Sequence, residues 1–183
     1  MRILSGKYKG RVLLSPKIKQ MRPTSSRLRE AIFDLMRDRI EDAQVLDVFC
    51  GVGGIGLEAL SRGAKSCVFV EKNPQVLKCL RQNLRAFEVD ALILSFDAID
   101  ALKLLQKKDK AFDFIYLDPP YQLKSSNKTY SQATLNSSSL LLKENARLIV
   151  EESSKQDLET PELLELLECR KYGNTSLHIF AKR

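Results

Sequence analysis

The amino-acid sequence predicts an α/β protein built on a mainly parallel sheet with helices on both faces. Apolar segments of strand length alternate along the chain with segments in which apolar residues recur at helical spacing. A glycine-rich segment at residues 51–56 joins the first core strand to a helix, as in nucleotide-binding, Rossmann-like sheets. The pair Gly173-Asn174 separates the last two apolar segments, so we expect the sheet to end in an antiparallel hairpin.

The N-terminal region predicts a small β-hairpin followed by a helix. Two short apolar pieces, Arg2–Leu4 and Arg11–Leu14, flank a link that contains glycines, which is typical of a hairpin. A proline and three hydroxyl residues then favour a helix start, and apolar residues recur at helical spacing over residues 25–40. We therefore expect a basic N-terminal hairpin arm at residues 1–24 and one domain at residues 25–183.

The core elements alternate between strand and helix. In chain order we expect strand 45–49, helix 55–62, strand 67–70, helix 74–87, strand 91–96, helix 98–107, strand 112–117, strand 148–151, helix 161–167, and a hairpin of strands 169–172 and 175–181. Residues 122–139 are rich in Ser, Asn, Lys and Thr, which favours a loop or a frayed helix start. The strands that alternate with helices should run parallel and be buried on both faces.

Composition excludes several classes of protein. With 44% hydrophobic and 29% charged residues in a chain of 183, we expect neither a disordered nor a membrane-spanning protein, and the polar start does not suit a signal peptide. The four cysteines form no CxxC pair and the chain has one histidine, so we expect neither a disulfide framework nor a metal site. These features favour a single-domain protein of the reducing cytoplasm.

Positive charge is concentrated at the N-terminus. Residues 1–29 carry nine Lys and Arg side chains and no acidic one, whereas the whole chain has a net charge of +7. The rest of the chain is therefore slightly acidic, and the basic arm favours a polyanionic partner. The charge run alone does not separate RNA from DNA or from an anionic membrane surface, and a solvated, solubilising face is the alternative.

The glycine-rich segment predicts a nucleoside-cofactor site. Gly51, Gly53 and Gly56 match the pattern G-x-G-x-x-G between a strand and a helix, where glycines allow a tight turn and close approach of a ligand. Glu71 ends the second core strand, twenty residues after Gly51, where a carboxylate can accept hydrogen bonds from both hydroxyls of a ribose. The pattern by itself does not identify the cofactor.

Two further carboxylates favour S-adenosylmethionine over a dinucleotide. Asp47 lies within the first core strand, where dinucleotide-binding proteins usually have an apolar residue and where a carboxylate suits the ammonium group of a methionine moiety. Asp97 ends the third strand, where it can accept a hydrogen bond from an adenine amino group. A turn contact for Asp47 and a helix N-cap for Asp97 are the structural alternatives. These carboxylates lie at or near the C-terminal ends of successive strands, and open α/β sheets bind ligands at that edge.

The fourth strand ends in Asp118-Pro119-Pro120-Tyr121, which predicts a site for an exocyclic amine. The Asp118 carboxylate and the Pro119 carbonyl are acceptors on a stiff turn, so together they can accept two hydrogen bonds from one planar –NH2 group. Such acceptors favour a pyramidal, nucleophilic nitrogen in the transition state, and Tyr121 offers a ring for stacking on the base. Methyl transfer from a sulfonium then needs in-line positioning and no metal. A purely structural turn is the alternative.

These motifs resemble those of a known family. Residues 115–121 (IYLDPPY) resemble the signature of amino-methyltransferases. Three further segments resemble bacterial 16S ribosomal RNA guanine-N2 methyltransferases: residues 47–64 (DVFCGVGGIGLEALSRGA), 22–33 (RPTSSRLREAIF) and 2–10 (RILSGKYKG). The resemblance spans the whole chain. Its departures are Cys50-Gly51-Val52, where the family more often has Ala-Gly-Ser, and a longer polar stretch after Tyr121.

The resemblance implies a seven-stranded fold that depends on S-adenosylmethionine and methylates the N2 amine of one guanine in 16S rRNA or the small ribosomal subunit. It implies this set of cofactor contacts by position: Glu71 for the ribose, Asp97 for the adenine, and Asp47 with Gly51 and Gly53 for the methionine end. Asp118, Pro119 and Tyr121 would hold the guanine. The arm would contact RNA through Arg2, Lys7, Lys9, Arg11 and Arg22. Neither a metal, nor a membrane, nor assembly beyond a monomer is implied.

Other functions fit part of the sequence. An adenine-N6 DNA methyltransferase can use the same Asp-Pro-Pro-Tyr element, but such enzymes usually carry a separate target-recognition domain, for which 183 residues leave no room. A protein glutamine methyltransferase does not explain the basic arm. A non-catalytic RNA-binding module on a methyltransferase scaffold does not need Glu71 and Asp118. An NAD dehydrogenase is least favoured, since no acid or base for hydride transfer is placed near the sheet edge.

Overall fold

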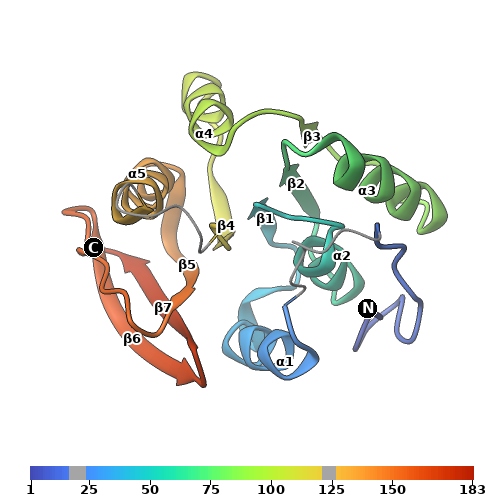
Figure 1. The fold of residues 1–183 in the computed structure, drawn as a ribbon, viewed down its shortest axis with the longest axis horizontal. Helices are drawn as coiled ribbons and strands as arrows, with labels where there is room; N and C mark the ends of the chain where they lie inside the picture. The colour runs from blue at the N-terminus through green and yellow to red at the C-terminus, as the bar shows by residue number, and fades with distance from the viewer. Residues whose placement is uncertain (17–23, 121–126) are drawn as a thin grey trace.

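The protein is built around a seven-stranded sheet with the strand order β3-β2-β1-β4-β5-β7-β6. The computed structural model describes residues 1–16, 24–120 and 127–183. The strands from β3 to β5 run parallel, and β7 runs antiparallel to both β5 and β6. Helices lie on both sides of the sheet (Figure 1). The predicted fold class, with its antiparallel terminal hairpin, is confirmed.

The strands and helices begin and end as follows. The strands are β1 (Gln44–Val48), β2 (Ser66–Val70), β3 (Ile93–Leu94), β4 (Phe112–Leu117), β5 (Leu142–Ser153), β6 (Leu164–Tyr172) and β7 (Thr175–Lys182). The helices are α1 (Ser26–Leu35), α2 (Gly54–Ser61), α3 (Pro74–Ala86), α4 (Ala98–Lys107) and α5 (Asn127–Ser139), and a 3-10 turn, η1 (Arg37–Arg39), follows α1. Ser25, Asn73 and Asp97 accept backbone N–H bonds as the N-caps of α1, α3 and α4.

Several predicted elements differ from the observed ones, among them the strand expected at residues 91–96, of which only Ile93–Leu94 forms β3. The helix predicted at residues 161–167 is wrong, because Leu164–Tyr172 forms strand β6, paired along its length with β7. Leucines at this spacing suit a helix or a strand, and the hairpin through Gly173 favours the strand by covering one edge of β7. The polar stretch 122–139 contains the well-formed helix α5, which buries Leu135 against the sheet. The predicted strand 148–151 lies inside the longer β5.

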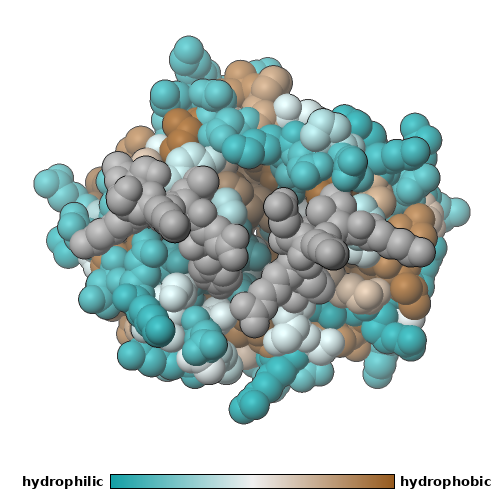
Figure 2. All heavy atoms as spheres, in the orientation of Figure 1, coloured by the Kyte–Doolittle hydropathy of each residue, from teal (hydrophilic) through white to brown (hydrophobic). Residues whose placement is uncertain are grey.

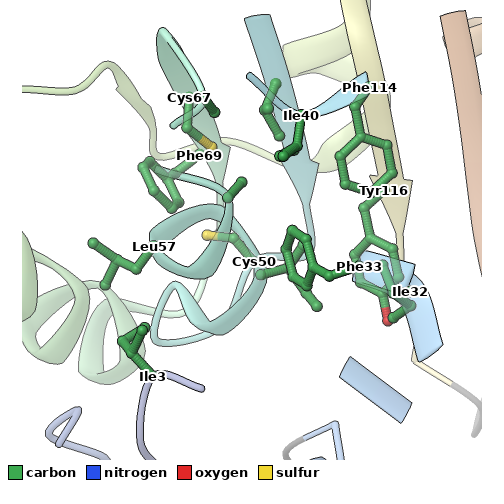
Figure 3. Packing of buried hydrophobic residues seen from close by; sticks show 14 of the residues in the cluster. Ile3, Ile32, Phe33, Ile40, Cys50, Leu57, Cys67, Phe69, Phe114 and Tyr116 are labelled. Carbon is green, nitrogen blue, oxygen red and sulfur yellow. The ribbon is translucent and has the colours of Figure 1, made fainter. Parts of the chain in front are cut away.

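Each face of the sheet carries its own apolar core. The core beneath α1, α2 and α3 contains side chains that Figure 3 shows packed together: Ile3, Ile32, Phe33, Leu57, Phe69, Phe114 and Tyr116. The core beneath α4 and α5 is built from Leu46, Val48, Leu102, Leu105, Ile115, Leu117, Leu135 and Phe180. The central strands are therefore apolar on both sides, which fixes their register and the positions of the loops at their ends.

The N-terminal segment (residues 1–14) packs on α2 and α3. The predicted hairpin is reduced to one antiparallel bridge between Arg2 and Val12. The backbone N–H groups of Leu4 and Ser5 donate to the two carboxylate oxygens of Glu58 at 2.8 and 3.0 Å. Glu58 is fully buried and also lies 3.6 Å from the buried guanidinium of Arg29. A buried carboxylate needs such partners, so α2 anchors this segment firmly.

Candidate active site

The predicted site residues of the parallel strands converge at one edge of the sheet. The parallel register places Asp47 of β1 beside Phe69 of β2 and Tyr116 of β4. The segments that follow these strands therefore emerge together, and they carry the glycine loop, Glu71 and Asp118. The strand order reverses between β1 and β4, where successive crossovers leave in opposite directions. Open α/β sheets bind ligands at such a point.

The glycine loop (residues 51–56) uses its glycines for two purposes. Gly51 and Gly53 have φ values of 55° and 88°, in the left-handed region that other residues rarely adopt. A Cβ atom at Gly51 would meet no heavy atom within 4 Å, so this side of the loop is open to a ligand. A Cβ atom at Gly56 would lie 2.3 Å from the Phe69 ring, so this glycine lets α2 pack closely on β2.

Asp47 lies beneath the glycine loop. Its side chain is buried, and Oδ2 accepts a hydrogen bond of 2.9 Å from the Gly56 N–H in the first turn of α2. Burial raises the pKa of Asp47 to about 7; the Gly56 hydrogen bond opposes the rise and the charge of Glu71 adds to it. Asp47 thus supports the loop, as the turn-contact alternative expects. A cation close to its buried carboxyl would lower the pKa of Asp47 and favour the ionised form.

Glu71 is held against the glycine loop by three backbone donors. Its Oε2 accepts from the Gly51 N–H at 3.2 Å, and its Oε1 accepts from the N–H groups of Lys72 and Asn73 at 2.8 and 2.7 Å. These bonds orient the carboxylate at the end of β2, beside the open side of Gly51. This is the position from which a carboxylate can bind the hydroxyls of a ribose.

Asp97 is part of a polar cluster at the start of α4. It caps the helix through the Ile99 N–H, pairs with Lys72 Nζ at 3.0 Å, and accepts from the Tyr130 hydroxyl at 2.9 and 3.0 Å. Burial alone would raise the pKa of Asp97, but the bonds from Lys72 and Tyr130 hold it below its ordinary value. The ring of Phe49 meets that of Tyr130 edge-on at 6.0 Å. Aromatic surface and an acceptor thus lie together, as an adenine requires.

Asp118, which is partly buried, lies next to the buried side chain of Glu151. The register that pairs Leu117 with Val150 brings the following residues, Asp118 and Glu151, side by side. Burial and the nearby charge of Glu151 raise the pKa of Asp118 well above its usual range, with Asp47 and Glu152 adding to the rise. Glu151 is buried and accepts a hydrogen bond from the Tyr116 hydroxyl. The Asp118 carboxyl therefore holds its proton more tightly than a solvent-exposed aspartate does.

Three residues that the structure brings to the candidate site were not singled out in the sequence analysis: Glu151, Tyr130 and Asn83. Glu151 follows no motif and becomes visible only through the pairing of β4 with β5. Tyr130 lies in the stretch predicted to be a loop or frayed helix start, and α5 is what carries it to Asp97. Asn83 looks like an ordinary polar residue of α3, yet it is buried. Asparagine is a poor helix former, so the presence of Asn83 inside a predicted helix was the signal in the sequence that this residue has a specific role.

The predicted RNA contacts differ in how freely they are displayed. Arg2, Lys7 and Lys9 are exposed on the N-terminal segment. The Arg11 guanidinium lies 4.2 Å from the centre of the Phe87 ring and donates to the Ala86 carbonyl, so it also caps α3. On the face seen in Figure 1, Figure 2 shows many hydrophilic side chains among the described residues, with hydrophobic patches between them. Arg22 and Tyr121 lie outside the described residues, and of the amine-site motif Pro119 is buried and Pro120 exposed.

Neither a membrane span nor a metal cluster is found in the part of the chain that the structure describes. None of its helices is long and apolar enough to cross a bilayer. None of its His, Cys, Asp and Glu side chains gather in threes suited to a metal ion.

Comparison with known proteins gives consistent matches over the whole chain. The family described as conserved hypothetical protein 95 matches residues 1–181. The ribosomal RNA small subunit methyltransferase D of Haemophilus influenzae is 32% identical over 183 residues, covering 98% of this chain and 93% of that protein. The Bacillus subtilis protein YlbH is 34% identical over the full length of both. The solved structure of yhhF from Escherichia coli has a TM-score of 0.84 at 29% identity, covering 100% of this chain and 98% of that one.

Proposed function

From the premise that the chain belongs to the family described as conserved hypothetical protein 95 and is an S-adenosylmethionine-dependent methyltransferase, we propose that it methylates the N2 amine of a guanine in 16S ribosomal RNA. A relative named as a small-subunit rRNA methyltransferase supports rRNA as the substrate class. The observation that carries the proposal is the position of Asp118 and Pro119, which follow β4 directly beside β1 and its glycine loop.

The residues around the glycine loop fit the cofactor. The open side of Gly51 allows a ligand to lie against the backbone, and the Glu71 carboxylate is fixed beside it. Asp97, with the rings of Phe49 and Tyr130, would bind the adenine. Asp47, with Gly51 and Gly53, would hold the methionine end, and its buried carboxyl would pair with the ammonium group there. When bound, S-adenosylmethionine supplies an electrophilic methyl group on its sulfonium.

The amine of the base would be held by the turn after β4. The Asp118 side chain and the Pro119 carbonyl would each accept one N–H of the guanine amine, which withdraws the nitrogen lone pair from the ring. Methylation leaves a positive charge on that nitrogen until a proton departs. An ionised carboxylate of the Asp118–Glu151 pair would stabilise such a charge and would then accept the proton that the nitrogen loses. Tyr121 would stack on the base.

The RNA would bind across the basic arm at residues 1–24, with residues 25–183 as the methyltransferase domain. The exposed side chains of Arg2, Lys7 and Lys9 would contact phosphates, and Arg11 and Arg22 would add to them. Phosphate contacts set affinity and register, whereas the contacts at the amine set the identity of the base. The protein would act in the cytoplasm as a monomer, on naked 16S rRNA or on the small subunit.

Transfer of labelled methyl groups to four substrates in parallel tests the proposal. Small ribosomal subunits, naked 16S rRNA, DNA and a glutamine-containing protein are each incubated with the enzyme and S-adenosylmethionine. We expect label in the ribosomal RNA of one or both RNA substrates. Label in DNA adenine would favour the adenine-N6 alternative, and label in protein the glutamine alternative. Cofactor binding without any transfer would favour a non-catalytic RNA-binding module.

A further inference from the structure

Asn83 of α3 connects the N-terminal segment with the glycine loop. Its side chain is 1% exposed. Its Oδ1 accepts from the Leu14 N–H at 2.8 Å, while its Nδ2 donates to the carbonyls of Leu14 and Val52, each at 3.0 Å. One amide thus joins segments that lie 69 and 31 residues away in sequence. Both hydrogens of Nδ2 are donated to carbonyl groups. If the amide were flipped, its NH2 group would face the Leu14 N–H, so these partners fix the orientation of the amide.

The contact with Val52 reaches the proposed cofactor site directly. Val52 lies between Gly51 and Gly53, the two loop residues with positive φ. Glu71 holds the loop from one side through the Gly51 N–H, and Asn83 holds it from the other through the Val52 carbonyl. The shape of the loop therefore depends on both side chains, although only Glu71 would touch the cofactor.

The contact with Leu14 reaches the proposed RNA-binding segment. Leu14 ends the segment that displays Arg2, Lys7 and Lys9, and its side chain is 53% exposed, so its backbone rather than its side chain is held by the core. The other end of this segment lies against the same loop, because a Cβ atom at Gly54 would come within 2.7 Å of Met1 Sδ. The segment is thus fastened to the start of α2 and, through Asn83, to the loop itself.

We propose that Asn83 is a positioning residue that fixes the RNA-binding N-terminal segment at a set distance from the methyl donor. This inference rests on the proposed function. RNA held by the cations of the segment would then present its guanine in line with the sulfonium methyl, and no rearrangement of the loop would be needed. Because a displacement of about 1 Å can cost roughly 100-fold in rate, such a fastening affects catalysis more than binding.

The test separates positioning from anchoring and from stability. Asn83→Leu has a similar volume and makes none of the three hydrogen bonds. With unmodified small ribosomal subunits and saturating S-adenosylmethionine, kcat should fall at least tenfold. The affinity for RNA and its salt dependence should change little, since the cations remain. Leu105→Ala, which opens a cavity on the opposite face of the sheet, is the control for lost stability and should retain kcat per folded molecule.

A second variant keeps the test decisive if Asn83→Leu fails to fold. Leu14→Pro removes the N–H that donates to Asn83 Oδ1 and should also lower kcat. Where Asn83→Leu does fold, the double variant should be no slower than Asn83→Leu alone. A kcat equal to that of Leu105→Ala would overturn the inference. So would weaker RNA binding with a flattened salt dependence and an unchanged kcat, which would make Asn83 an anchor only. If the wild type does not methylate the subunits at all, the proposed function fails instead.

Discussion

Raising the pH from 6 to 7 should tighten cofactor binding, because it ionises Asp47. Burial raises the pKa of this carboxyl from 3.8 to about 7, even though the Gly56 N–H stabilises the charged form. At pH 6 only about a tenth of the Asp47 carboxyls are ionised, whereas about half are ionised at pH 7. If the ionised form binds the ammonium group of S-adenosylmethionine, its Kd should fall about fivefold over this interval.

The free energy of unfolding should fall over the pH range in which cofactor binding tightens. The folded pKa of Asp47 lies above the unfolded value, so the folded state holds the proton more tightly. The stability that Asp47 contributes is therefore fully present below about pH 4 and is lost as the pH rises towards 7. Because the pKa rises by about three units on folding, the stability lost over this pH range is about 4 kcal/mol. Asp47→Asn removes the titration and should be the more stable protein at pH 7 if its amide keeps the bond from Gly56.

Calorimetric titration with S-adenosylmethionine at pH 6.0, 6.5 and 7.0 checks this prediction. Asp47→Asn is the control, since any pH dependence that it retains belongs to the cofactor or to other groups. Circular dichroism at each pH confirms that both proteins are folded. Equal pH dependence in the two proteins, or none in the wild type, would refute the assignment of Asp47 to the methionine end of the cofactor.

Three further substitutions test the other roles. Glu71→Ala should raise the Kd of S-adenosylmethionine at least tenfold in calorimetry, since it removes a charge-assisted pair of hydrogen bonds to the ribose; a value within twofold of wild type contradicts that role. Asp118→Ala should lower kcat by about 10²–10³ with nearly unchanged cofactor affinity. Asp118→Asn should retain more activity, because its side-chain carbonyl still accepts a hydrogen bond. Equal rates for both variants and the wild type would refute the role of Asp118. Replacing Arg2, Lys7 and Lys9 together by Ala should flatten the slope of log K against log salt by about 2–3, measured by fluorescence anisotropy on RNA, without changing the methylated nucleoside. An unchanged slope would remove these cations from the interface.

Most of the sheet was predictable, because parallel strands buried on both faces are marked by continuous apolar runs. β1, β2 and β4 appear in the sequence for this reason, and so do the capped helices between them. The strand 169–172 of the terminal hairpin was predicted, but the N-terminal half of β6 was not, since its leucines suit a helix and its pairing depends on the free edge of β7. α5 was not predictable either, because its polar residues do not favour a helix by themselves and the helix is stabilised by packing on the sheet.

The site was predictable where a side chain directly follows a strand. Glu71 and Asp118 directly follow β2 and β4, and Asp97 follows the short strand β3 as the N-cap of α4, so the topology brings all three to the same edge of the sheet. Glu151 and Asn83 were missed because their roles arise from contacts between distant segments. The sequence analysis divided the chain into an arm and a domain, but the structure ties the two together, because the N–H groups of Leu4 and Ser5 donate to Glu58, 54 and 53 residues further along the chain. Deleting residues 1–14 would remove two of the N–H donors to that buried carboxylate, so substitution of the exposed cations is the better test.

The identity of the methylated nucleoside tests the central claim most directly. Unmodified small ribosomal subunits are incubated with the enzyme and labelled S-adenosylmethionine, and their 16S rRNA is digested to nucleosides and analysed by mass spectrometry. The account predicts one labelled product, N2-methylguanosine, which is lost with Asp118→Ala. A labelled N6-methyladenosine, a label on a ring carbon or a ribose, or N2-methylguanosine formed equally well by Asp118→Ala would contradict it.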